Sequence, residues 1–110
     1  MDGKSNMRER MAATFPDFID FTQKRLFGEI WNREGLSPRD RSLITVAMIC
    51  ASYQPAALDH HLQYAVQNGV TKSELKEVKM HVAFYAGWPS AVSAMQHALD
   101  FLEDREQEEK

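Results

Sequence analysis

The chain has 110 residues, of which 44% are hydrophobic and 26% are charged, and this composition is typical of a globular protein rather than a disordered or fibrous one. Its length predicts a single domain over residues 1–110, with a core at about 16–102 and charged, mobile ends. The net charge of −3, with basic residues interspersed among acidic ones, argues against a nucleic-acid partner.

The start of the chain lacks the apolar segment of a secretory signal. The longest strongly apolar stretch, residues 43–51, is too short to cross a bilayer, so no membrane partner is expected. The only cysteine, Cys50, cannot form a disulfide within the chain. We therefore expect a cytoplasmic protein.

The first predicted helix follows Pro16 and ends near residues 32–35, because apolar residues recur there at helical spacing. These residues are Phe18, Phe21, Leu26, Ile30 and Trp31. A second helix should begin at Ser37-Pro38, where a capping residue precedes proline in the first helical position. Its apolar residues are Leu43, Ile44, Val46, Ala47 and Cys50.

Three further helices complete the prediction of an all-α bundle of about five to six helices. Pro55 should open one that closes at Gly69, and its expected inward residues are Leu58, Leu62, Ala65 and Val66. The pattern from Thr71 to Glu74 predicts a capping box for the next helix, which should bury Leu75, Val78, Val82 and Tyr85. The last helix opens at Pro89, with Val92, Met95, Leu99 and Leu102 on one inward stripe.

Polar and aromatic residues on these helices are the candidates for chemistry. His61 lies three residues after Leu58 and should stand on or beside the buried stripe, whereas His60 should point about 100° away. A core histidine is the structural alternative for His61. Likewise, His81 can pair with Glu77, Arg41 with a nearby acid, and Tyr85 and Trp88 can be core or interface aromatics.

Four segments in order, residues 28–33, 35–45, 61–71 and 85–89, resemble conserved blocks of the carboxymuconolactone decarboxylase family. The resemblance covers most of the chain and implies the fold shared with alkylhydroperoxidase D. That peroxidase carries cysteines seven and four residues before the matching histidine, where this chain has Gln54 and Ala57, and an upstream glutamate where it has Ser42. Cys50 matches neither cysteine. The family's decarboxylases usually carry a glutamate at the position of Ala57.

The resemblance implies decarboxylation of a small carboxylated lactone or related acid in aromatic compound degradation. Because the conjugated lactone accepts the electrons of the departing carboxylate, no cofactor or metal is required. The implied catalytic residues are His61 as the first choice of general acid and His81 as the second, Arg41 to orient the carboxylate, and Tyr85 as a donor to the enolate oxygen. Substrate-binding roles are expected for Arg33, Glu29 and Trp88.

Two other functions stay open at this point. One is a peroxidase activity of the alkylhydroperoxidase D type that uses Cys50, and the other is a non-catalytic helical binding module. A metal site built from His60, His61 and His81 is disfavoured because adjacent histidines on a helix diverge. A homo-oligomer, trimer or hexamer, is implied by the resemblance and agrees with the many large apolar residues of so short a chain.

Overall fold

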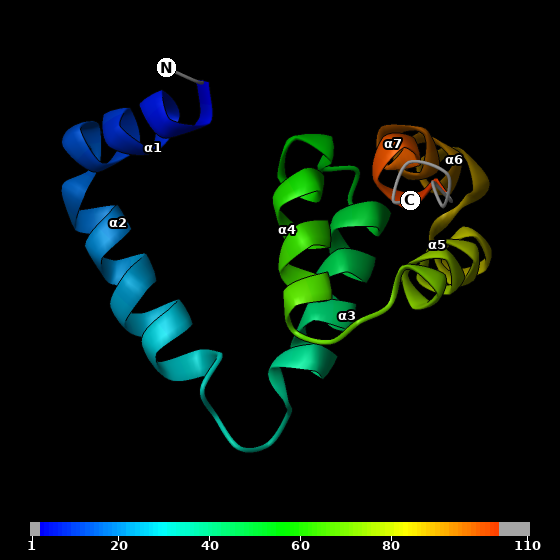
Figure 1. The fold of residues 1–110 in the computed structure, drawn as a ribbon, viewed down its shortest axis with the longest axis horizontal. Coiled ribbons are helices and arrows are strands. Elements are labelled where there is room, and N and C mark those ends of the chain that lie inside the picture. The colour runs from blue at the N-terminus through cyan, green and yellow to red at the C-terminus, as the bar shows by residue number, and fades with distance from the viewer. Residues whose placement is uncertain (1–2, 104–110) are drawn as a thin grey trace, which may run out of the picture. The chain divides into compact units, whose positions relative to one another are not determined.

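The computed structural model describes residues 3–103, and every regular element in that range is a helix (Figure 1). The predicted all-α fold class is thereby confirmed. The chain divides into two compact units, Met1–Ser37 and Pro38–Lys110, which are described separately below. The predicted single domain stays a prediction. The predicted mobility of the charged C-terminal end concerns residues 104–110, which lie outside the described residues.

The first unit contains α1 (Gly3–Thr14), α2 (Pro16–Phe21) and the π-helix η1 (Thr22–Ile30). Pro16 starts α2, as the sequence predicts, and the helix continues without a break into η1. The i→i+5 pattern is visible at the end of η1, where the backbone N–H of Trp31 donates to Leu26 at 2.9 Å. Helix α1 and the π geometry were not predicted.

The second unit begins with a pair of antiparallel helices, α3 (Pro38–Ala51) and α4 (Pro55–Gln67), which lie side by side in Figure 1. Both start at the prolines that the sequence indicates. The turn between them holds Tyr53 at φ 57°, a left-handed conformation that is uncommon for a residue other than glycine. At the open end of the pair, the side-chain amide of Asn68 donates to the buried Ser42 hydroxyl at 2.9 Å.

Helices α5 (Lys72–Ala86), α6 (Trp88–His97) and α7 (Leu99–Leu102) complete this unit. The predicted capping box of α5 is present, because the Thr71 hydroxyl accepts from the Glu74 backbone while the Glu74 carboxylate accepts from the Thr71 backbone. Arg39 in the first turn of α3 also donates to Glu74, and this ion pair joins the starts of α3 and α5. Gly69 and Gly87 take the positive φ values of 102° and 117° at the two helix junctions.

The core of the second unit lies among α3 to α7 and is built from small and branched apolar residues. Its buried members are Val46, Cys50, Leu58, Leu62, Ala65, Val70, Leu75, Val82, Ala94, Ala98 and Leu102. Val78 packs against this cluster but is only partly buried. Each fully buried leucine stabilises the fold by about 1.5–3 kcal/mol relative to an exposed one.

Several predicted inward positions are wrong. On α6 and its C-cap the buried stripe is Ala91, Ala94 and Ala98, while Val92 and Met95 of α6 and Leu99 of α7 are exposed. Each alanine precedes its predicted neighbour by one residue, so the true inward face is rotated by about 100° from the predicted one. The small alanine side chains allow α6 to approach the core closely.

Two further inward predictions fail in the same unit. Tyr85 on α5 is 82% exposed and Val66 on α4 is also exposed. The inward face of α5 instead runs through Leu75, Lys79 and Val82, about one helical turn apart, and Tyr85 is turned about 90° away from the middle of that face. Within residues 3–103, none of the helices combines the length and apolar character that crossing a membrane requires.

Candidate functional site

His61 stands half-buried on α4, between the buried residues Leu58 and Leu62, as its spacing predicts. Its ring lies edge-on to that of His60 with 5.0 Å between centroids, and exposed His60 in turn stacks on Tyr64. Burial, reinforced by the positive charge that His60 can carry, lowers the pKa of His61 below its ordinary 6.5. His61 is therefore mainly neutral at pH 7.

Arg41 lies on α3, the neighbour of α4, and is also half-buried. Its backbone carbonyl accepts a hydrogen bond from the Thr45 hydroxyl at 2.8 Å. The contact between Ser42 and Asn68 fixes how the two antiparallel helices align. Because His61 precedes Asn68 by seven residues, it lies about 10 Å along α4 from the level of Arg41. The two residues share one helix pair but occupy different levels of it.

His81, Tyr85 and Trp88 form a second set of predicted site residues, on α5 and at the start of α6. All three are exposed. The rings of His81 and Tyr85 lie 4.8 Å apart, and Trp88 meets Phe84 edge-on at 5.6 Å. This set is an aromatic surface that also carries an imidazole and a phenol.

Glu29 and Arg33 belong to the first unit. Glu29 is exposed and forms an ion pair with Arg25 one turn earlier, with an N–O distance of 3.0 Å. Arg33 lies just after the π-helix, where its backbone N–H donates to Ile30 at 3.2 Å. The roles assigned to all seven predicted site residues, Arg33, Glu29, Arg41, His61, His81, Tyr85 and Trp88, stay predictions.

A buried lysine is the polar feature that the sequence analysis missed. Lys79 on α5 and Cys50 on α3 are each 1% exposed, and the Lys79 amine donates to the Cys50 sulfur at 3.3 Å. The signal was available in the sequence, since Lys79 follows Leu75 by four residues and precedes Val82 by three. Lysine is almost never fully buried, and this is why the pattern is easily overlooked.

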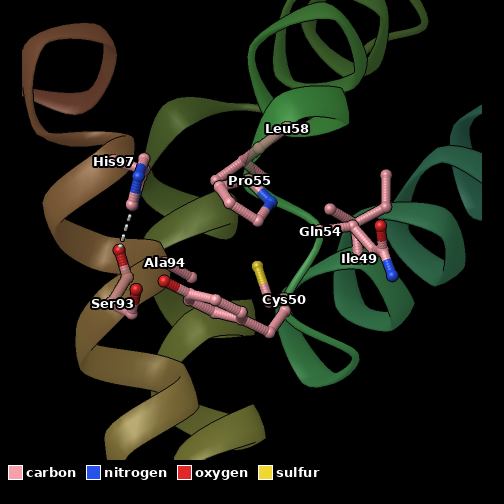
Figure 2. Close-up of a pocket in the computed structure, with 9 residues that line it drawn as sticks. Ile49, Cys50, Gln54, Pro55, Leu58, Ser93, Ala94 and His97 are labelled. Carbon is pink, nitrogen blue, oxygen red and sulfur yellow. Dashed lines mark hydrogen bonds between the residues drawn. The ribbon is translucent and has the colours of Figure 1, made fainter.

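A small cavity lies beside the same cysteine. It has about 10 Å³ of space, roughly what one water molecule occupies. The residues that line it are Ile49, Cys50, Tyr53, Gln54, Pro55, Leu58, Ser93, Ala94 and His97. Figure 2 shows the Cys50 sulfur pointing into the space bounded by Pro55 of α4 and by Ala94 and His97 of α6.

His97 at the rim of this cavity has a defined tautomer when neutral. Its Nδ1 lies 2.9 Å from the carbonyl oxygen of Ser93 (Figure 2). A carbonyl oxygen only accepts hydrogen bonds, so Nδ1 carries the proton and Nε2 is left as an acceptor. In the described part of the chain, no three His, Cys, Asp or Glu side chains gather into a group that could hold a metal ion.

Comparison with known proteins bears on this arrangement directly. The model of the carboxymuconolactone decarboxylase family matches residues 16–100. The chain belongs to this family. The match includes α2 through α6, and therefore both helices that carry His61 and Arg41.

Three curated proteins are similar to this chain. The 4-carboxymuconolactone decarboxylase of Acinetobacter baylyi is 41% identical over 80% of this chain and 66% of its own length. Nitrosuccinic acid decarboxylase npaB of Metarhizium robertsii is 39% identical over 63% of this chain and 48% of its own length. An uncharacterized 15.0 kDa protein from the nqo9-nqo10 intergenic region of Paracoccus denitrificans is 31% identical over 91% of this chain and 74% of its own.

The coverage of the two named decarboxylases is partial. The chain spans just under two thirds of the Acinetobacter protein and about half of the Metarhizium one. The reaction and the substrate of this chain are therefore proposals.

Proposed function

We propose that the protein is a cofactor-free decarboxylase that acts on a small carboxylated lactone or related acid. The observation that carries this proposal is His61, which is half-buried on α4 with a lowered pKa and lies in a segment matched by the family model. A titratable group perturbed by burial in this way is a candidate for proton transfer. The names of two relatives at 41% and 39% identity support decarboxylation as the reaction class.

For this decarboxylation the protein has to bind the substrate and supply one proton. In 4-carboxymuconolactone the electrons of the broken C–C bond flow into the conjugated lactone carbonyl. In a nitro-substituted dicarboxylic acid they flow into the nitro group. Both substrates supply their own electron acceptor, so the protein needs a cation to orient the carboxylate and an acid to protonate carbon afterwards.

Arg41 is the proposed cation, because a guanidinium binds a carboxylate through two parallel hydrogen bonds. The offset of about 10 Å between the levels of Arg41 and His61 is more than a hydrogen bond spans. We therefore place the substrate between them, with its carboxylate toward Arg41 and the carbon to be protonated toward His61.

His61 is the proposed acid. Its lowered pKa makes the protonated imidazole a stronger acid than ordinary histidine, but this form is populated only at lower pH. After giving its proton to the substrate carbon, neutral His61 is re-protonated from solvent. His81 remains the second candidate for this role, and Tyr85 the proposed donor to the enolate oxygen.

The proposal includes a homo-oligomer, trimer or hexamer. The support is the exposed aromatic surface of α5 and α6, on which Phe84 and Tyr85 are 73% and 82% exposed. Apolar side chains this exposed mark association surfaces. A copy seated there would remove Tyr85 and Trp88 from water and could complete a site. We keep the sequence-based expectations of a cytoplasmic location and of a role in aromatic compound degradation.

Activity of the purified protein tests the proposal. Carbon dioxide release is measured with 4-carboxymuconolactone and with nitrosuccinic acid, for the parent and for His61→Gln, with His60→Gln as the matched control. We expect turnover of at least one substrate, a loss of about 10²–10⁴-fold in His61→Gln, and little loss in His60→Gln. Turnover of neither acid, or full activity of His61→Gln, would contradict it.

A further inference from the structure

The pair of Cys50 and Lys79 is not used by the proposed reaction and lies in the core of the second unit. Both side chains are almost completely shielded from water, with a sulfur to nitrogen distance of 3.3 Å. Burying an amine without a partner is costly, so the thiol is the polar group that makes this burial tolerable. The fold thus holds a sulfur nucleophile and a nitrogen nucleophile in direct contact.

The cavity described above gives the sulfur a route to small molecules. Cys50 is part of its wall, while Lys79 is absent from the lining (Figure 2). The sulfur therefore separates the cavity from the lysine nitrogen. With room for about one water molecule, the cavity favours the smallest oxidants, such as hydrogen peroxide, over bulky reagents.

We propose that Cys50 and Lys79 form a reversible covalent cross-link, a sulfenamide, when the protein meets hydrogen peroxide. The sulfur first attacks one peroxide oxygen. The O–O bond breaks, an S–O bond forms, and the thiol proton leaves with the other oxygen as water. The product is a sulfenic acid whose oxygen occupies the cavity.

The Lys79 amine then attacks the sulfur. An S–N bond forms, the S–O bond breaks, and the hydroxyl leaves with one amine proton as a second water molecule. A lysine that starts as ammonium also releases one proton to solvent. Sulfur is oxidised by two electrons and peroxide is reduced to water. The amine comes from the core while oxygen leaves into the cavity, which suits in-line displacement.

This assignment gives the lysine the role that a second cysteine plays in dithiol peroxidases. The sulfenic acid is consumed by the nearest nucleophile before further oxidation to sulfinic acid. The bond also ties α3 to α5, because Cys50 and Lys79 belong to these two helices. Once the protein is unfolded, added thiols reach the sulfur and regenerate both side chains by attacking it.

Peptide mapping tests the cross-link. The full chain is treated with hydrogen peroxide, quenched with catalase, unfolded in urea, alkylated without reductant and digested with trypsin. The linked state joins residues 42–72 to residues 77–105, because a modified Lys79 is not cleaved. We expect this pair, two hydrogen atoms lighter than the sum of its peptides, to account for most of the lost thiol and to disappear with dithiothreitol.

Two lysine variants sharpen the test. Lys79→Met should abolish the linked pair and leave a sulfenic acid at Cys50 that dimedone traps after unfolding, whereas Lys76→Met, one turn earlier and exposed, should link like the parent. If Lys79→Met does not fold, the parent and Lys76→Met decide the question. An unreacted Cys50, its oxidation without linkage, or a linkage that retains an oxygen atom would overturn the proposal.

Discussion

At the scale of single residues, the contact between Lys79 and Cys50 places a polar pair inside an otherwise apolar core. The buried neighbours Val46, Leu75 and Val82 offer no hydrogen-bonding side chain. Removing the thiol should leave the amine as a buried donor without its acceptor, which costs about 1–3 kcal/mol beyond lost packing. The coupling between these two side chains is therefore measurable.

A double-mutant cycle measures the coupling between Cys50 and Lys79. Cys50→Ala should lower the free energy of unfolding by more than the same change does in a Lys79→Met background, because methionine fills the space without needing an acceptor. Urea denaturation gives the four free energies. Equal effects of Cys50→Ala in both backgrounds would show that the thiol does not support the lysine.

His61 supplies a pH prediction whose sign follows from its lowered pKa. The folded state binds the proton less tightly than the unfolded state, whose histidine titrates near 6.5. Its contribution to stability is present above pH 6.5 and is lost as pH falls through the folded pKa. The free energy of unfolding should fall less steeply with acid in His61→Gln than in the parent over that range. Identical slopes would contradict the lowered pKa.

The sequence predicted part of this residue-scale picture. His61 lies beside the buried stripe and His60 points away, as a helix with 3.6 residues per turn requires. The burial of Lys79 was not predicted, because lysine is usually exposed and this preference outweighs the helical spacing that favours burial. The hydrogen bond from Lys79 to the Cys50 sulfur depends on how α3 and α5 pack, which the sequence alone does not show.

At the scale of helices, Thr71 and Glu74 fix the start of α5. Thr71→Ala removes the cap and should lower the free energy of unfolding by about 1 kcal/mol. Ser73→Ala, which changes an exposed hydroxyl in the same turn, is the matched control and should have a smaller effect. Chemical denaturation measures both, and equal losses would mean that the cap has no special role.

Glu74 also makes the start of α5 sensitive to acid. The Glu74 carboxylate accepts a hydrogen bond from the Thr71 backbone N–H, and this bond, together with Arg39, holds the pKa of Glu74 below its ordinary 4.5. Its contribution to stability is present above that pH and is lost as pH falls through the folded pKa. Glu74→Gln should flatten the acid limb of the stability profile, and an unchanged limb would contradict the shift.

Gly87, between α5 and α6, has φ 117° and ψ 144°, a region that only glycine occupies readily. Gly87→Ala should therefore destabilise the protein by about 1–3 kcal/mol, although no atom of the described residues 3–103 lies within 4 Å of the added methyl group. Within the same residues Gly35→Ala meets no neighbour either and has no positive φ, so it should be nearly neutral. Thermal unfolding compares the two, and equal effects would contradict backbone strain as the cause.

Helix starts were predicted well because they depend on local chemistry. Pro38, Pro55 and Thr71 each stand where a helix begins. Helix faces were predicted less well when two stripes competed. On α6 the stripe of Val92 and Met95 is more hydrophobic than the alanine stripe, but the alanines are buried because they let the helices approach. The π-helix depends on a hydrogen-bond register that spacing alone does not specify.

At the scale of the whole molecule, the predicted site residues are divided between the two compact units, with Glu29 and Arg33 in the first and the others in the second. His61 and Arg41 share one helix pair, whereas Tyr85 and Trp88 lie on an exposed aromatic surface. The family resemblance predicted which residues to examine. It did not predict where they lie, because the order of motifs along the chain does not specify which helices pack together or whether a second copy of the chain completes the site.

Association should therefore be measurable. Phe84→Glu places a charge on the exposed aromatic surface of α5. Because an unpaired charge buried at an interface is costly, this change should shift the protein toward a monomer, as measured by light scattering. Lys76→Glu, an exposed change on the same helix, is the control. A monomeric parent protein would contradict the homo-oligomer proposal.

The pH dependence of kcat/KM tests whether His61 delivers the proton to the decarboxylated substrate, since this profile reports the free enzyme's essential acid. We predict that kcat/KM falls as pH rises, with a midpoint below 6.5, and that His60→Gln moves this midpoint upward by removing the neighbouring positive charge. A profile without this limb, or a midpoint that His60→Gln leaves in place, would contradict the account.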